Sequence, residues 1–132
     1  MKSKDDLELT RLKNRYVMGL AHYLQEECNL SRSVSMKKAH LACRLLDALG
    51  KGYAIFTFRK QDGTYRRAKG TLNPLLIPDL DATKKKEEGK NKKVIERAPN
   101  VCVFWDMEMK SWRSFRVERL VRIEKSVLHS ND

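Results

Sequence analysis

The spacing of apolar residues changes abruptly near residue 51, and this change limits what the chain can fold into. Before Gly50 the apolar residues recur at steps of three and four, which is the stripe of an amphipathic helix. After Gly52 the sequence turns aromatic and β-branched, as strands prefer. The pattern predicts an α+β chain, with a helical N-terminal region over residues 1–50 and a β region over 51–132.

The helical region divides into two predicted helices. The first covers about residues 5–27, with Asp5 or Asp6 as its cap and Asn29 as its stop. We expect residues 31–35 to connect it to a second helix that Ser33 or Ser35 caps and that runs to about residue 49. Gly50 is expected to supply a left-handed C-terminal cap.

Turn residues divide the β region into four or five short strands. Asp62-Gly63 lies between the strand-like runs 53–60 and 65–72, which predicts a hairpin. Further strands are expected at 100–106 and 111–118, and residues 120–127 fit a last strand or a helical turn. Pro74 and Pro78 interrupt the pattern and precede a lysine-rich loop at about 79–97, whose residues 94–97 can open the next strand. Strands and turns of this kind predict a small barrel.

The chain is strongly basic, with a formal net charge of +11. Nineteen of its 28 lysines and arginines lie after residue 50. A field of this sign attracts polyanions, and RNA, DNA, an anionic membrane and an acidic protein all qualify. The three cysteines form no CxxC pair, and we find neither a signal-peptide region nor a membrane-spanning apolar run. We therefore expect reduced thiols and a location in the cytoplasm.

Three segments together resemble the WYL-related, Sm-like SH3-barrel family, which is common among small proteins of phages and mobile elements. They are FTFRKQDGTYRRAKGTL at 56–72, FWD at 104–106 and WRSFRVERL at 112–120. The resemblance spans roughly residues 33–123 and implies an SH3-like barrel without catalytic activity. It also implies that residues 112–120 are similar to an arginine-bearing segment that related domains use for anionic ligands. The Trp-Tyr-Leu tripeptide that names the larger family is replaced here by Asn100-Val101-Cys102.

Basic and aromatic side chains in three segments form the candidate nucleic-acid-binding set. Guanidinium groups bind phosphates in a fork, and aromatic rings stack on exposed bases. If residues 112–117 are extended, Trp112 and Arg116 share one face and Arg113 the other, so only part of the set converges on one ligand. The alternative is a solvated strand whose arginines pair with neighbouring carboxylates. The full set is Arg59, Lys60, Tyr65, Arg66, Arg67, Lys69, Lys84, Lys85, Lys86, Trp112, Arg113, Arg116, Arg119 and Arg122.

These features predict a non-enzymatic nucleic-acid-binding accessory or regulatory module of phage or mobile-element origin. No catalytic motif or metal-ligand spacing is present, so we expect no catalytic residue, no cofactor and no metal. Single-stranded DNA or RNA is favoured over a specific duplex because no recognition helix stands out. Two alternatives stay open: a protein-interaction component, such as a phage virion or counter-defence protein, and a sensor of a small anionic ligand. The first predicted helix either packs on the core or offers a surface to a protein partner.

Overall fold

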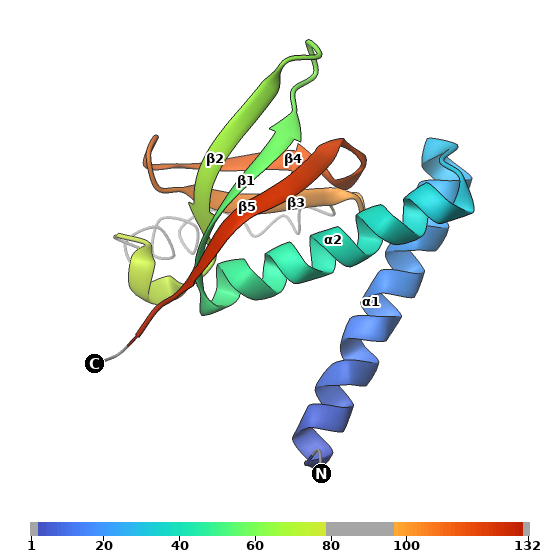
Figure 1. Ribbon diagram of the computed structural model, residues 1–132, viewed down its shortest axis with the longest axis horizontal. Helices are drawn as coiled ribbons and strands as arrows, with labels where there is room; N and C mark the ends of the chain where they lie inside the picture. The colour runs from blue at the N-terminus through green and yellow to red at the C-terminus, as the bar shows by residue number, and fades with distance from the viewer. Residues whose placement is uncertain (1–2, 79–96, 131–132) are drawn as a thin grey trace, which may run out of the picture.

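The computed structural model describes residues 3–78 and 97–130 and shows two helices followed by a five-stranded antiparallel sheet (Figure 1). The α+β class expected from the change of period is confirmed, and the change from helix to strand falls between Lys51 and Gly52. The elements in chain order are α1 (Lys4–Cys28), α2 (Arg32–Lys51), β1 (Gly52–Arg59), β2 (Tyr65–Thr71), η1 (Pro74–Leu76), β3 (Val101–Asp106), β4 (Ser111–Arg116), η2 (Val117–Arg119) and β5 (Leu120–Leu128).

Helix α1 begins earlier than predicted. Ser3, not Asp5 or Asp6, is its N-cap: the Ser3 hydroxyl accepts from the Asp6 N–H at 3.2 Å, and the Asp6 carboxylate accepts from the Ser3 N–H. This reciprocal pair is a capping box, and it satisfies two backbone donors that a helix start leaves free. The predicted stop at Asn29 is confirmed, because this residue takes the left-handed conformation with φ 57°.

Both predicted ends of α2 were wrong. Ser31 caps the helix by accepting from the Val34 N–H at 3.2 Å, so residues 32–35 are helical and not a connector. Gly50 stays helical, and Gly52 ends the helix instead. A side chain at Gly52 would collide with the backbone at Val127, because β5 passes close beside it. No helix among the described residues is long and apolar enough to cross a membrane.

The strand order is β4-β3-β2-β1-β5. The predicted hairpin pairs β1 with β2 through seven residue pairs and turns at Gly63, whose φ of 91° suits glycine. By contrast, β2 pairs with β3 only at Gly70 and Thr71. The rest of the hairpin therefore leaves β3 and projects beyond the sheet (Figure 1).

Strands β4 and β5 lie at the two ends of this order and are joined by η2. Of the two possibilities for residues 120–127, the structure shows the strand, β5. The predicted strand at 111–118 ends at Arg116, and the short helix η2 follows it at 117–119. The described residues contain no ladder between β4 and β5, so the structure shows a five-stranded sheet and not a hydrogen-bonded closed barrel. The expected lysine-rich loop lies almost wholly outside the described residues, and Arg97 is not in a strand.

One hydrophobic core joins the helices to the sheet. Four phenylalanines form its centre, and Phe56 meets Phe104 edge-on with ring centroids 5.0 Å apart. Leu24 from α1 and Leu45 from α2 are fully buried in the same cluster. Helix α2 packs on β5 and β1, and the second half of α1 packs on α2. The core thereby fixes one side of the sheet and leaves the projecting hairpin free to wall a cleft.

Candidate functional site

A cleft of about 610 Å³ opens where the β1–β2 hairpin separates from β3 and β4. The hairpin forms one wall of this cleft, and the edge strand β4 with the following η2 forms the other. Seven of the candidate residues line the cleft although they come from segments some fifty positions apart. The lining consists of Phe58, Arg59, Lys60, Gln61, Arg66, Val101, Trp112, Arg113, Ser114, Phe115, Arg116 and Arg119.

The lining is strongly cationic. It holds five arginines and one lysine, and its described residues include no aspartate or glutamate. Within the described part of the chain, Arg66 and Arg113 are the lining residues that form ion pairs, and both do so with Asp106 behind the cleft. Among the described residues, no carboxylate forms an ion pair with the other four cations. Like charges gathered in a concave surface concentrate the positive potential, which favours an anionic ligand.

Asp106 holds the two walls together. Its Oδ2 accepts from Arg66 Nη2 on the hairpin at 2.7 Å and lies 3.7 Å from Arg113 Nε on β4. Its Oδ1 accepts from the backbone N–H groups of Glu108 and Met109, at 3.0 and 2.9 Å, and so closes the β3–β4 turn. The residue is only 1% exposed. One buried carboxylate therefore sets the position of two arginines and of the turn that leads into β4.

Aromatic rings form the floor and one rim of the cleft. Phe58 and Phe115 stack with centroids 5.3 Å apart and an interplanar angle of 21°. Both are nearly buried, so they support the arginines and give the floor an apolar surface. Trp112 is 41% exposed, and its ring meets Trp105 edge-on at 5.5 Å. Trp112 is thus the lining aromatic with a ring that a base can reach.

The alternation of side chains along β4 had suggested that only part of its candidate set can converge on one ligand. Trp112 and Arg116 do alternate with Arg113 and Phe115 in burial, as an extended strand requires. All four nevertheless line the same cleft. The reason is the position of β4 at the edge of the sheet: a cleft that runs along an edge receives side chains from both faces of the strand.

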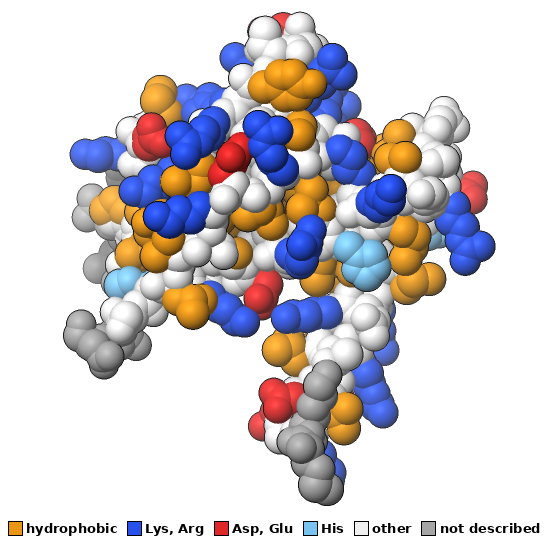
Figure 2. Space-filling view, viewed as in Figure 1, with side chains coloured by type: hydrophobic (Ala, Val, Ile, Leu, Met, Phe, Trp, Pro, Cys, Tyr) orange, Lys and Arg blue, Asp and Glu red, His pale blue; other side chains and the backbone are white. Residues whose placement is uncertain are grey.

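Four other candidates lie away from the cleft lining, on strands β2 and β5 on either side of β1, where Arg67 and Arg122 both pair with Thr57. Figure 2 shows lysine and arginine side chains over this part of the sheet. Their side chains are partly engaged with one another and with neighbours. The Arg59 guanidinium lies 5.8 Å from the centroid of the exposed Tyr65 ring, and Lys69 lies 4.7 Å from that of Tyr53. The four residues are Tyr65, Arg67, Lys69 and Arg122.

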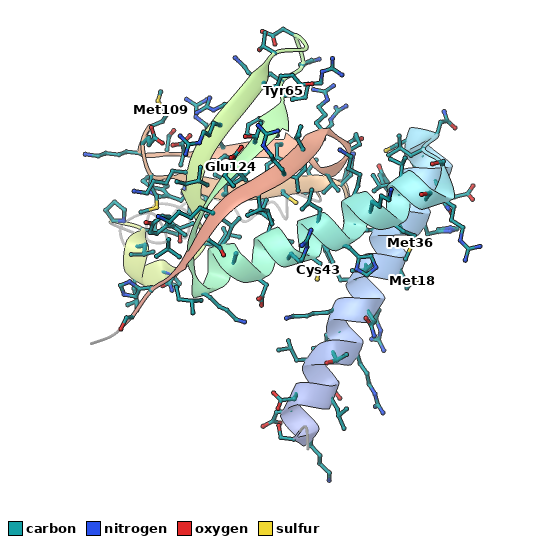
Figure 3. All side chains as sticks on the ribbon, viewed as in Figure 1. Met18, Met36, Cys43, Tyr65, Met109 and Glu124 are labelled. Carbon is teal, nitrogen blue, oxygen red and sulfur yellow. The ribbon has the colours of Figure 1, made fainter. Side chains whose placement is uncertain are left out.

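Glu124 neutralises part of this second face. Its carboxylate accepts from Arg122 at 2.7 Å and from the Thr57 hydroxyl at 3.0 Å (Figure 3 labels Glu124 and Tyr65). The Arg122 hydrogen bond, then that of Thr57, holds the pKa of Glu124 below its usual value. The basic side chains thus lie on two faces instead of one, and the cleft is the face without a carboxylate in its described lining.

Three candidates, Lys84, Lys85 and Lys86, lie outside the described residues. Conversely, sequence reasoning missed Phe58 and Gln61 as lining residues and Asp106 as the anchor of the walls. From the sequence, Asp106 was assigned only to the end of the strand 100–106, at the start of the turn that follows, and to the FWD segment of the family resemblance. An aspartate at the start of a turn is a recognisable signal for backbone capping, but nothing local to it points to an arginine forty residues earlier.

The fold and the cleft together define a class: a small α+β protein with an arginine-rich cleft at the edge of an antiparallel sheet. A family model described as WYL_2, Sm-like SH3 beta-barrel fold matches residues 42–121, and the chain belongs to this family. The match includes every residue of the cleft and leaves out α1.

A curated relative supports the same assignment. The chain is 31% identical over 75 residues to a protein of Enterobacteria phage T4 described as "Uncharacterized 11.5 kDa protein in Gp31-cd intergenic region". The aligned part covers 57% of this chain and 69% of the phage protein. The chain matches no solved structure. The expected resemblance to a WYL-related family with phage members is thus confirmed.

Proposed function

We propose that this protein is a non-enzymatic nucleic-acid-binding module whose basic cleft holds the backbone of a single strand of DNA or RNA. The observation that carries the proposal is the gathering of six cations around an aromatic floor, with no carboxylate in the described lining. Arginine binds phosphate oxygens through a planar fork, and five of the six cations are arginines.

The shape of the site favours a single strand. Single-strand binders combine a positive groove that follows the backbone with aromatic side chains on which bases stack. Here the arginines of β4 and η2 line one wall, and Trp112 supplies an exposed ring at the rim. A duplex-reading helix would need an exposed polar face beside the cations, whereas α2 packs on the sheet.

The phage relative supports an origin and a cellular location for this activity. A chain with a phage relative and a family match is consistent with a phage or mobile-element product that acts in the cytoplasm of the host, or within the virion. In either place a basic cleft meets nucleic acid at high local concentration. An Sm-like barrel, as the family description has it, would serve as the rigid support of the cleft.

Fluorescence anisotropy across a salt series tests the proposal with single-stranded DNA, RNA and duplex DNA. We expect affinity for single strands to exceed that for duplex and to fall with salt, with a slope near −0.7 per phosphate contact on single strands. Replacing Arg113 and Arg116 with alanine should reduce that slope by about 1.4. Arg11→Ala/Arg32→Ala is the matched control, since it removes two exposed arginines from the helices. Equal losses in both double variants, or no binding at low salt, would rule the proposal out.

The size of the cleft supports a second candidate, a sensor of a small anionic ligand. A volume of about 610 Å³ is within the range of small-molecule pockets. Such a sensor would be stabilised against heat by one particular nucleotide and not by inorganic polyphosphate or an oligonucleotide. Stabilisation by generic polyanions of every kind would instead favour the first candidate.

A further inference from the structure

The first half of α1 is a well-formed helix that packs against little of its own chain. Its earliest buried residue is Val17, and before it Leu7, Leu9 and Leu12 are each about half exposed. In Figure 1 this half extends away from the rest of the molecule, and Figure 2 shows apolar side chains along it. A free helix of about 13 residues is marginal in water. The capping box at Ser3 nevertheless fixes its start, which indicates a helix kept for a contact.

Two of the exposed leucines, Leu9 and Leu12, lead into a groove. Leu12 and Tyr16 of α1 and Cys43 and Leu46 of α2 line a hollow of about 290 Å³ where the two helices diverge (Figure 3 labels Cys43). Leu9, Leu12 and Tyr16 follow one another at steps of three and four, so they lie on one helical face. This apolar face is continuous with the groove.

Charges flank the face in a self-complementary order. Glu8 and Arg15 lie seven residues apart along one flank, and Asp6 and Lys13 lie seven residues apart along the other. On each flank the acid is nearer the N-terminus. An identical helix laid antiparallel therefore places each acid beside a base.

We propose that two copies of this chain pair through the first halves of their α1 helices, antiparallel and related by a twofold axis. In this pairing Leu9 of each copy contacts Leu12 of the other at the mouth of the groove. Glu8 meets Arg15 of the second copy, and Asp6 approaches Lys13, which also forms an ion pair with Asp47 at 3.3 Å. The contact is isologous, as a dimer with a twofold axis requires.

The length of the helix sets the strength of the pair. About 13 residues give a contact roughly 20 Å long, since each residue advances the helix by about 1.5 Å. That is at the small end of specific interfaces, so we expect a reversible dimer with a Kd in the micromolar range. The two basic clefts are outside this contact, and the inference does not depend on what they bind.

Sedimentation equilibrium of the full chain, without nucleic acid and with a reductant to keep Cys43 from crosslinking, tests the pairing. Wild type should pass from monomer to dimer as its concentration rises to several hundred micromolar. Leu9→Glu should remain monomeric across this range. Leu75→Glu is the matched control because Leu75 is an exposed leucine on η1, and it should dimerise like wild type.

Charge reversal gives the sharper test. Glu8→Arg and Arg15→Glu should each raise the Kd about tenfold, because two ion pairs per dimer become repulsive. The combined Glu8→Arg/Arg15→Glu variant should restore dimerisation. A wild type that stays monomeric, a Leu9→Glu variant that still dimerises, or a combined variant no better than the single ones would overturn the proposal. Circular dichroism confirms in each case that the helices are retained.

Discussion

Arg66 donates a hydrogen bond of 2.7 Å to Asp106, and this contact joins the projecting hairpin to the turn that begins β4. The Asp106 side chain is 2% exposed and the Arg66 side chain 24% exposed. The backbone ladder between β2 and β3 ends at Gly70. Beyond that point the Arg66–Asp106 pair connects the two strands in place of backbone hydrogen bonds. It keeps the cleft at a fixed width.

Removing that carboxylate should destabilise the protein and disorganise the cleft. Asp106→Ala leaves Arg66 and two backbone N–H groups without their acceptor, so we expect a loss of about 3 kcal/mol in the free energy of unfolding. Asp106→Asn keeps an oxygen for the turn and should lose less. Urea denaturation measures both changes. If Asp106→Ala left the free energy of unfolding unchanged, the Arg66–Asp106 pair would not be what fixes the hairpin.

Trp112 should contribute to the affinity for single strands without contributing to the salt dependence of binding. Its exposed ring can stack on a base, so Trp112→Ala should weaken single-strand binding by about 1–3 kcal/mol. Because no phosphate contact is lost, the slope of log K against log salt should stay unchanged. Anisotropy at several salt concentrations measures both quantities. A changed slope with unchanged affinity would contradict the stacking role.

Gly70 should tolerate no side chain. A Cβ there would lie 2.6 Å from Phe104 and 3.2 Å from Phe56, two rings fixed in the core. Gly70→Ala should therefore cost about 1–3 kcal/mol through overpacking. Gly19→Ala is the control, because a Cβ at Gly19 would have no atom within 4 Å. Alanine also favours the helix, so this variant should be more stable by up to about 1 kcal/mol. Thermal unfolding should shift in opposite directions for the two variants.

Stability should fall between pH 9 and 11. Burial raises the pKa of the Cys102 thiol from 9.0 to about 11, and it raises that of the neighbouring Tyr16 hydroxyl as well. The folded state holds these protons when the unfolded chain has released them, so the stabilisation is complete below pH 9 and lost as pH rises through 11. Cys102 alone accounts for about 3 kcal/mol, since each pKa unit corresponds to about 1.4 kcal/mol.

The pH dependence can be assigned by substitution. Cys102→Ala should make the free energy of unfolding, measured with urea at pH 8 and above, less steep in pH than that of wild type. His129→Ala changes an exposed residue near the C-terminal end of the described chain and should leave the slope as it is. A Cys102→Ala profile parallel to that of wild type would contradict the assignment.

The elements were predictable because their signals are local. Apolar residues that recur at steps of three or four indicate each helix. The four-residue turn that contains Asp62-Gly63 indicates the hairpin. The ends of the helices were less predictable. Ser3, Ser31, Ser33 and Ser35 are equally good caps by type, and only the structure shows that Ser35 is buried inside α2.

The sequence by itself determined the α+β class, the hairpin, the excess of positive charge and the likeness to a WYL-related family. Only the tertiary structure decided which cations share a surface. Arg66 and Arg67 are adjacent in the chain, yet Arg66 lines the cleft while Arg67 lies on the other face, because neighbouring side chains of a strand point in opposite directions. Arg66 meets Arg113 because β2 leaves β3 after two residue pairs and Asp106 holds both. That arrangement depends on packing between residues some forty positions apart, which no short stretch of sequence encodes.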